Sequence, residues 1–177
     1  MVIWKFGTEL RKIEASDIET IRVWRNQLFV RKNMQFDGEI SEIEQQQWYA
    51  SLDKTKNHYF IFGNKKVEVG LIHLKNIDGI KQTAEAGIFI GRESYLNHPI
   101  AVAATMALMD YAFETLHLNE LTAKMNERNG SVLKFNLGLG YKFQNKYNQE
   151  FSYYKVSAKD YFHSTSKLRN TLEKLSF

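Results

Sequence analysis

The segment Ala84–Tyr141 combines residue types in an order that suits binding of a phosphorylated ligand. A strand is expected at 84–91, a polar loop at 92–99 and a helix at 100–117. The first N–H groups of a helix lack intrahelical partners and, together with the helix dipole, favour an anion. Ala101, Ala103 and Ala104 would let a bulky ligand come close to the first turn. Because alanine is also a good helix former, a plain core helix explains the same residues.

The elements around this segment must position it, and their periodicity predicts an α/β domain. Strands are expected at 10–13, 58–62, 67–74, 82–91, 120–125, 142–148 and 150–157, and further helices at 17–28, 41–52, after Asn129 and within 163–177. Capping boxes predict the two early helix starts, at Ser16/Glu19 and Ser41/Glu44. The run Gly63-Asn64-Lys65-Lys66 indicates a hairpin. In the last helix, Leu168, Leu172 and Leu175 are spaced for one face, which is typical of a packed or dimer-contact helix.

Length and composition restrict the class of protein. The chain has 177 residues, which favours one domain over residues 1–177, with a core at about 8–160 and a helical tail at 161–177. It contains no cysteine, so disulfides, thiolate metal sites and a cysteine nucleophile are excluded. The five histidines show no metal-ligand spacing, and we expect no metal. No apolar run could span a bilayer and the N-terminus does not resemble a secretory signal, so we expect no membrane association and a cytoplasmic location.

The net charge of +4 is carried by basic residues scattered among acidic ones, a pattern that argues against nucleic-acid binding and is compatible with a small phosphorylated ligand.

Two stretches resemble the GNAT superfamily of N-acetyltransferases. The first is Leu96-Asn97-His98-Pro99-Ile100-Ala101, at the place of the family's pyrophosphate-binding loop. Ala101 fits the family pattern, whereas Leu96 stands at its basic or Gln position and Pro99 at its first Gly. The second stretch runs from Asn129 through Asn136 to Leu139-Gly140-Tyr141. The resemblance implies a single-domain GNAT-like α/β fold, with a mixed, mostly antiparallel sheet that is splayed at its centre and has helices on both faces.

The resemblance also implies acetyl-CoA as co-substrate and assigns residues to it. Phosphate would be bound by the amides of Asn97, His98, Ala101 and Val102, and the pantetheine arm by the strand backbone at Phe89 and Ile90 and by Asn129 and Asn136. Asn129 is equally suited to be a helix N-cap, and Gly140 to be the left-handed residue that ends the helix.

Catalytic roles follow from the same comparison. Glu85 lies where several relatives carry the carboxylate that removes a proton from the attacking amine; a surface strand residue paired with a lysine is the alternative. The family often protonates the departing thiolate with a Tyr, but that position is Asn136 here, which leaves Tyr141 and Tyr95 as weaker candidates.

The acceptor side of such a fold is built from the N-terminal helices. Trp24, Arg25, Asn26 and Arg31 are similar in arrangement to nucleotide-amino-sugar acetyltransferases of the pseudaminic acid type and to ribosomal-protein N-terminal acetyltransferases. Arginine can pair with a diphosphate, and tryptophan can stack on a base or sugar. Trp48 is the alternative stacking residue and more readily a core anchor. We therefore expect transfer to the amine of a small acceptor, a nucleotide-linked amino sugar, with peptide N-termini or a non-catalytic binding role as alternatives. A homodimer is compatible with the edge strands and the last helix.

Overall fold

One twisted sheet organises the protein, and the computed structural model describes it over residues 1–174. The eight strands are β1 (Val2–Lys5), β2 (Thr8–Lys12), β3 (His58–Gly63), β4 (Glu68–Asp78), β5 (Thr83–Ile90), β6 (Glu120–Asn126), β7 (Lys142–Lys146) and β8 (Phe151–Ser157). Their order is β1-β2-β3-β4-β5-β6-β8-β7, and every pair is antiparallel except β5 and β6. The expected mostly antiparallel α/β sheet is confirmed.

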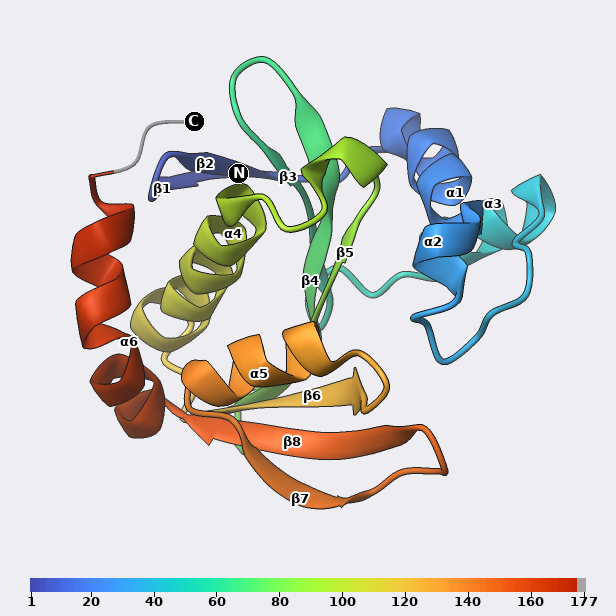
Figure 1. Ribbon diagram of the computed structural model, residues 1–177. Helices are drawn as coiled ribbons and strands as arrows, with labels where there is room; N and C mark the ends of the chain where they lie inside the picture. The colour runs from blue at the N-terminus through green and yellow to red at the C-terminus, as the bar shows by residue number, and fades with distance from the viewer. Residues whose placement is uncertain (175–177) are drawn as a thin grey trace.

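Helices cover both faces of the sheet (Figure 1). They are α1 (Ile18–Asn26), α2 (Leu28–Arg31), α3 (Glu42–Ala50), α4 (Pro99–Asp110), α5 (Gly130–Gly138) and α6 (Ala158–Leu172). On one face, α4 and α6 pack on the main core, which includes Leu10, Phe60, Leu121 and Tyr161. On the other face, Ile21 and Trp24 of α1 pack on Ile61 and Leu71 in a smaller core. None of these helices is long and apolar enough to cross a membrane.

The sheet splits between β5 and β6. These two strands pair only at Thr83–Glu85 with Glu120–Thr122, whereas β6 pairs with β8 along its whole length. Figure 1 shows that β4 and β5 run in a clearly different direction from β6 and β8. A sheet splayed at its centre was expected, and the short register shows where the splay begins.

Several local predictions are confirmed. Ser41 and Glu44 form the predicted capping box of α3, and the hairpin at Gly63 joins β3 to β4. Asn129 caps α5 by accepting a hydrogen bond from the N–H of Val132. Gly140 has a φ of 95°, the left-handed geometry that ends that helix.

The predicted capping box at Ser16 and Glu19 is wrong. The Asp17 carboxylate instead accepts from the Glu14 N–H at 2.7 Å and is held by Arg11, so a short 3₁₀ turn at Ala15–Asp17 precedes α1. The predicted helix 17–28 is also divided, because Gln27 is extended and its side chain donates to the Gly91 carbonyl.

The predicted helix 100–117 ends earlier as an α-helix. A π-helical turn at Tyr111–Thr115 follows α4, His117 adopts a left-handed φ of 53°, and the Leu118 N–H donates to the Ala112 carbonyl. This closing turn redirects the chain into β6. Strand β1 was not anticipated, and of the predicted leucine stripe, Leu172 is buried in the main core, Leu168 packs against it and Leu175 lies outside the described residues.

Candidate active site

The split in the sheet leaves one side of β5 without a strand neighbour. Gln82 and Ala84 direct their carbonyls toward β6, where Glu120 N–H and Thr122 Oγ1 donate to them. On the other side of β5, Gly91 N–H donates to the carbonyl of Val69 in β4. Backbone groups alternate in direction along a strand. The N–H and C=O groups of Ala86, Ile88 and Ile90 are therefore directed into the split, and those of Phe89 toward β4.

This alternation separates two predicted cofactor residues. Ile90 directs its backbone N–H and C=O into the split, so its predicted role in binding an extended, amide-bearing ligand stays a prediction that this direction allows. Phe89 does not, because its backbone pairs with Leu71 of β4 and its side chain packs on the smaller core.

The first N–H groups of α4 are hydrogen-bonded within the chain. His98 is the N-cap, and its Nδ1 accepts from the Ile100 N–H at 3.2 Å. The His98 N–H donates to the Tyr95 carbonyl, and the Ala101 N–H donates to the His98 carbonyl. An anion at this end competes with the His98 imidazole for the Ile100 N–H. The prediction that the His98 and Ala101 amides are available to phosphate is therefore corrected: both are engaged within the chain.

Two other residues predicted for this loop differ in position. Asn97, with a φ of 63°, forms the left-handed turn that leads into the helix. Val102 lies one turn inside α4, four residues after His98, and its N–H belongs to the helical ladder.

Glu85 lies on the face of the sheet that carries α1 and α3. It forms an ion pair with Lys75 of β4 at 3.0 Å, and its side chain is 18% exposed. Burial raises the pKa of nearby Tyr59 to about 12, and the negative charge of Glu85 adds to that shift. The lysine partner that the alternative interpretation required is thus present, at the point where β5 and β6 diverge.

His73 occupies the same face, beside Glu85, and the sequence did not identify it. Its ring lies 4.9 Å from that of Tyr59, and its Nδ1 is buried with no hydrogen-bond partner among the described residues. A Cβ at Gly87 would lie 2.6 Å from His73 Nε2, so the imidazole rests directly on the β5 backbone. Burial lowers the pKa of His73 to about 3, with Lys75 contributing, so the ring is neutral. The register that pairs His73 with Gly87 was the signal that could have revealed it.

The N-terminal residues predicted to bind substrate mostly hold a loop, residues 32–40. Arg25 Nη2 donates to the Phe36 carbonyl, Arg31 Nε donates to the Asp37 carbonyl at 2.6 Å, and Arg31 pairs with Glu39. Asn26 donates to the Ile40 carbonyl and accepts from its N–H. All three side chains act on the loop backbone, which makes them positioning residues for it.

Arg25 has a second feature. Its Nη1 is buried without a partner among residues 1–174, and burial together with Arg31 lowers the pKa of this guanidinium.

The Trp24 prediction is corrected. Its ring is buried against Gly91, where a Cβ would lie 2.3 Å from it, so the ring is not available for stacking. Trp48 is more exposed than Trp24 and packs edge-on against Tyr59 at 5.1 Å. The expectation that Trp48 is the better core anchor is thus reversed.

The loop 32–40 reaches across to the far half of the sheet. Asn33 Oδ1 accepts from Asn129 Nδ2 at 3.2 Å, and Gln35 Nε2 donates to the Tyr147 hydroxyl at 2.8 Å. Lys124 of β6 completes the contact by donating to Gln35 Oε1 at 3.5 Å. The loop therefore bridges α2 to the half of the sheet beyond the split.

A cation–aromatic group lies at this contact. The Lys124 ammonium is 4.7 Å from the Tyr147 ring centre and 5.5 Å from that of Tyr153, and the two rings meet edge-on at 5.3 Å. Because Thr122 pairs with Glu85 and side chains alternate along a strand, Lys124 is on the same face as Glu85. Aromatic rings of this kind pack on other flat rings, and an ammonium pairs with anions.

The remaining predicted residues belong to α5 and its end. Asn136 is half-buried and donates to the Val132 carbonyl within its own helix. Tyr141 is buried in the main core, and burial raises the pKa of its hydroxyl. That placement counts against Tyr141 as the proton donor to a departing thiolate. No group of three or more metal-ligating side chains occurs in residues 1–174.

Comparisons with known proteins agree with this fold. A family model described as an acetyltransferase (GNAT) domain matches residues 8–142. Comparison with curated proteins gives no significant match. Solved structures with the same fold include FdhC, a nucleotide-linked sugar GNAT, which is 20% identical over 97% of this chain and 98% of that chain, with a TM-score of 0.80.

Two further structures show the same fold at low identity. The spermidine N-acetyltransferase from Vibrio cholerae, in complex with CoA and spermine, is 17% identical over 88% of this chain and 98% of that chain, with a TM-score of 0.77. A domain from Methanocaldococcus jannaschii is 20% identical over 85% and 97%, with a TM-score of 0.74. Since the family model matches well over half of the chain, including β2 to β6, the split and the α4 N-terminus described above, the chain belongs to the GNAT family of acetyltransferases.

Proposed function

We propose that the protein transfers an acetyl group from acetyl-CoA to the amine of a nucleotide-linked amino sugar. The observation that carries this proposal is the group formed by Lys124, Tyr147 and Tyr153 on the Glu85 face. Its two rings suit a nucleobase or sugar, and its ammonium suits a diphosphate. The same ammonium would repel a polyamine. The likeness to the sugar GNAT FdhC supports this choice over the spermidine enzyme.

The split suits the pantetheine arm of acetyl-CoA, because Ala86, Ile88 and Ile90 direct backbone donors and acceptors into it. The α4 N-terminus suits the pyrophosphate once the His98 side chain turns away from the Ile100 N–H. Leu96 and Pro99 offer no cation and no N–H there, so we expect modest rather than tight binding of the phosphates.

The chain's own groups then serve the transfer. Glu85 takes the proton from the acceptor ammonium, directly or through a water molecule, because only the free amine has a lone pair. The amine nitrogen forms a bond to the thioester carbonyl carbon, the carbon–sulfur bond breaks, and the thiolate leaves with its electron pair. The nitrogen releases its second proton to solvent, which gives the amide, and the thiolate takes up a proton from solvent. The β5 N–H groups directed into the split stabilise the negative charge that develops on the carbonyl oxygen. The neutral His73 beside Glu85 keeps a further positive charge away from the incoming cation.

A direct assay of CoA thiol release tests the proposal with three acceptors: a UDP-linked amino sugar, spermidine and a peptide with a free N-terminus. We expect the sugar nucleotide to be preferred. Lys124→Ala should raise its KM about tenfold, a loss of about 1.4 kcal/mol, with kcat little changed. Lys155→Ala is the matched control, because Lys155 is already paired with Glu120 at 2.9 Å, and it should change KM much less.

Three other results would contradict parts of the proposal. Preference for spermidine, improved by Lys124→Ala, would refute the acceptor class. Preference for the peptide would select the protein N-terminal alternative. Binding of acetyl-CoA without turnover of any acceptor would indicate a non-catalytic member of the fold.

A further inference from the structure

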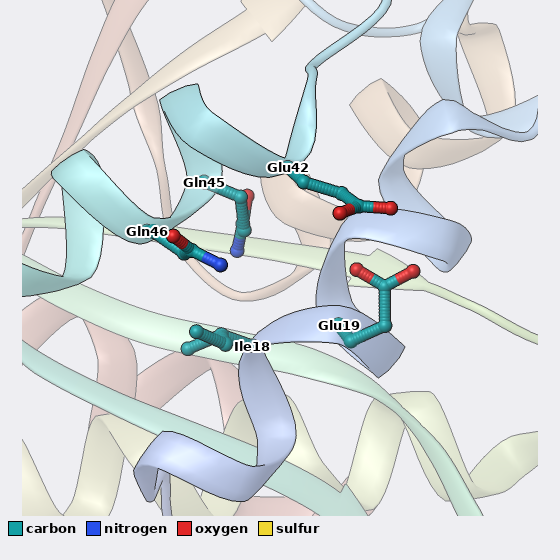
Figure 2. A pocket seen from close by; sticks show the side chains of 5 residues that line it. All are labelled: Ile18, Glu19, Glu42, Gln45 and Gln46. Carbon is teal, nitrogen blue, oxygen red and sulfur yellow. The ribbon is translucent and has the colours of Figure 1, made fainter.

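A cavity of about 340 Å³ lies between α1 and α3, and its lining shares no residue with the candidate active site. Ile18 and Glu19 line it from the first turn of α1, and Glu42, Gln45 and Gln46 line it from α3. Figure 2 shows the Gln45 and Gln46 amides on one side of this cavity, Ile18 below them and the two glutamates opposite. Its size is in the range of small-molecule sites.

Gln45 is the residue that distinguishes this cavity from an ordinary gap between helices. Its side chain is only 5% exposed, yet its Nε2 has no hydrogen-bond partner among the described residues. In Figure 2 this nitrogen is directed between Gln46 and Ile18, into the cavity. A buried amide donor without a partner is unfavourable, and native structures seldom leave one unless something else satisfies it. A ligand oxygen in the cavity would supply the acceptor.

The charges of the cavity define the other end of such a ligand. Glu19 is held by Arg22, which donates to both of its carboxylate oxygens at 2.6 and 2.8 Å. Arg22 lies 3.8 Å from Glu42, too far for a hydrogen bond, and Glu42 is largely exposed. The carboxylates of Glu19 and Glu42 and the guanidinium of Arg22 sum to a net negative charge. Glu42 can therefore accept a hydrogen bond from an ammonium group. Acidic residues in a first helical turn are common by themselves, so the assignment depends on Gln45 as well.

We propose that this cavity binds a small ammonium compound that carries hydroxyl groups next to the nitrogen, as a vicinal amino alcohol does. The ammonium pairs with Glu42, a hydroxyl oxygen accepts from Gln45 Nε2, and Ile18 packs on the carbon skeleton. This site is separate from the acetyl-transfer site and does not depend on the acceptor proposed above.

Binding to the full-length protein, measured by isothermal titration calorimetry without acetyl-CoA, tests the proposal with three probes. Glucosamine carries both features, N-acetylglucosamine lacks the charge and cyclohexylamine lacks the hydroxyl groups. We expect glucosamine to bind at least about tenfold more tightly than either, and its affinity to fall as salt is added. Equal binding of the three probes, or no binding of glucosamine at millimolar concentration, would overturn the proposal.

Variants locate the binding. Gln45→Met should weaken glucosamine binding about tenfold while leaving thermal stability unchanged or higher, because the unpaired donor is gone. Glu42→Gln should weaken it similarly. Gln47→Met, an exposed position on the same helix, should have no effect. Lys124→Ala and Glu85→Gln should also have no effect; if either abolishes binding while Gln45→Met does not, glucosamine occupies the active site and the cavity is not a site.

Discussion

Replacing Asp110 by asparagine should destabilise the protein strongly, because this carboxylate joins three elements. Asp110 ends α4 and is 1% exposed. It accepts from the Tyr161 hydroxyl and Arg169 Nη1, both at 2.8 Å and both from α6, and from Lys5 of β1 at 2.5 Å. Burial by itself raises the pKa of Asp110, but the hydrogen bonds from Arg169, Lys5 and Tyr161 outweigh it, so the net pKa lies below its usual value.

The magnitude follows from how much the two cations can rehydrate. Removing one partner of a buried ion pair costs about 3–5 kcal/mol. The Lys5 and Arg169 side chains are 32% and 18% exposed, so water can partly replace the lost carboxylate. We therefore expect the lower end, about 3 kcal/mol, which for a domain of this size lowers Tm by about 6–12 °C.

Urea unfolding followed by circular dichroism at pH 7 measures this difference. Glu114→Gln is the matched control, because Glu114 pairs with the same Lys5 at 3.0 Å but is 51% exposed, and it should cost less than about 1 kcal/mol. The low pKa of Asp110 means that its contribution is present above its unfolded pKa of 3.8 and is lost as the pH falls through the folded value. If Asp110→Asn costs no more than Glu114→Gln, the network does not hold β1 and α6 on α4.

Three further predictions concern positions that the fold constrains. His73 has a folded pKa of about 3 against 6.5 unfolded, so the free energy of unfolding should fall as the pH drops below 6.5, by at most about 1.4 kcal/mol per pH unit. His73→Phe should flatten that slope between pH 7 and 5, and equal slopes for the two proteins would contradict a buried neutral ring. Gly87→Ala places a Cβ 2.6 Å from His73 Nε2 and should cost about 1–3 kcal/mol in urea unfolding. His73→Ala in the same chain should relieve part of that loss, and strictly additive effects of the two substitutions would show that residues 73 and 87 do not touch. Gly140→Ala, at a φ of 95°, should cost about 1–2 kcal/mol by thermal unfolding, and an unchanged Tm would refute the left-handed assignment.

Much of the fold was predictable because its signals are local. The capping box at Ser41, the hairpin at Gly63 and the glycine at 140 each depend on a few neighbouring residues and on backbone geometry that those residues favour. The box at Ser16 failed because Arg11, a residue of another element, fixes Asp17 and shifts the helix start. Strand β1 was missed because four residues at a sheet edge are stabilised by pairing with β2 rather than by their own pattern.

The candidate site was predictable only in part for the same reason. Glu85 and the loop before α4 could be placed from their order along the chain. The roles of Arg25, Asn26 and Arg31 could not, because their partners are backbone groups of a loop whose course is decided by packing. Lys124, Tyr147 and His73 were not singled out, since they are brought together by cross-strand register and by a loop that crosses between the two halves of the sheet.

The sequence by itself determined the class of fold, the order of the elements and the family to which they belong, because hydrophobic period, turn residues and caps act over short distances. Only the tertiary structure decided which atoms remain available for chemistry. The split between β5 and β6 frees the backbone of Ala86, Ile88 and Ile90, while backbone carbonyls of Tyr95 and His98 occupy two N–H groups, of His98 and Ala101, that the sequence offered to a phosphate. Whether a backbone N–H or C=O group is free to bind a ligand depends on all the residues around it in space, and the pattern of neighbouring residues along the sequence does not contain that information.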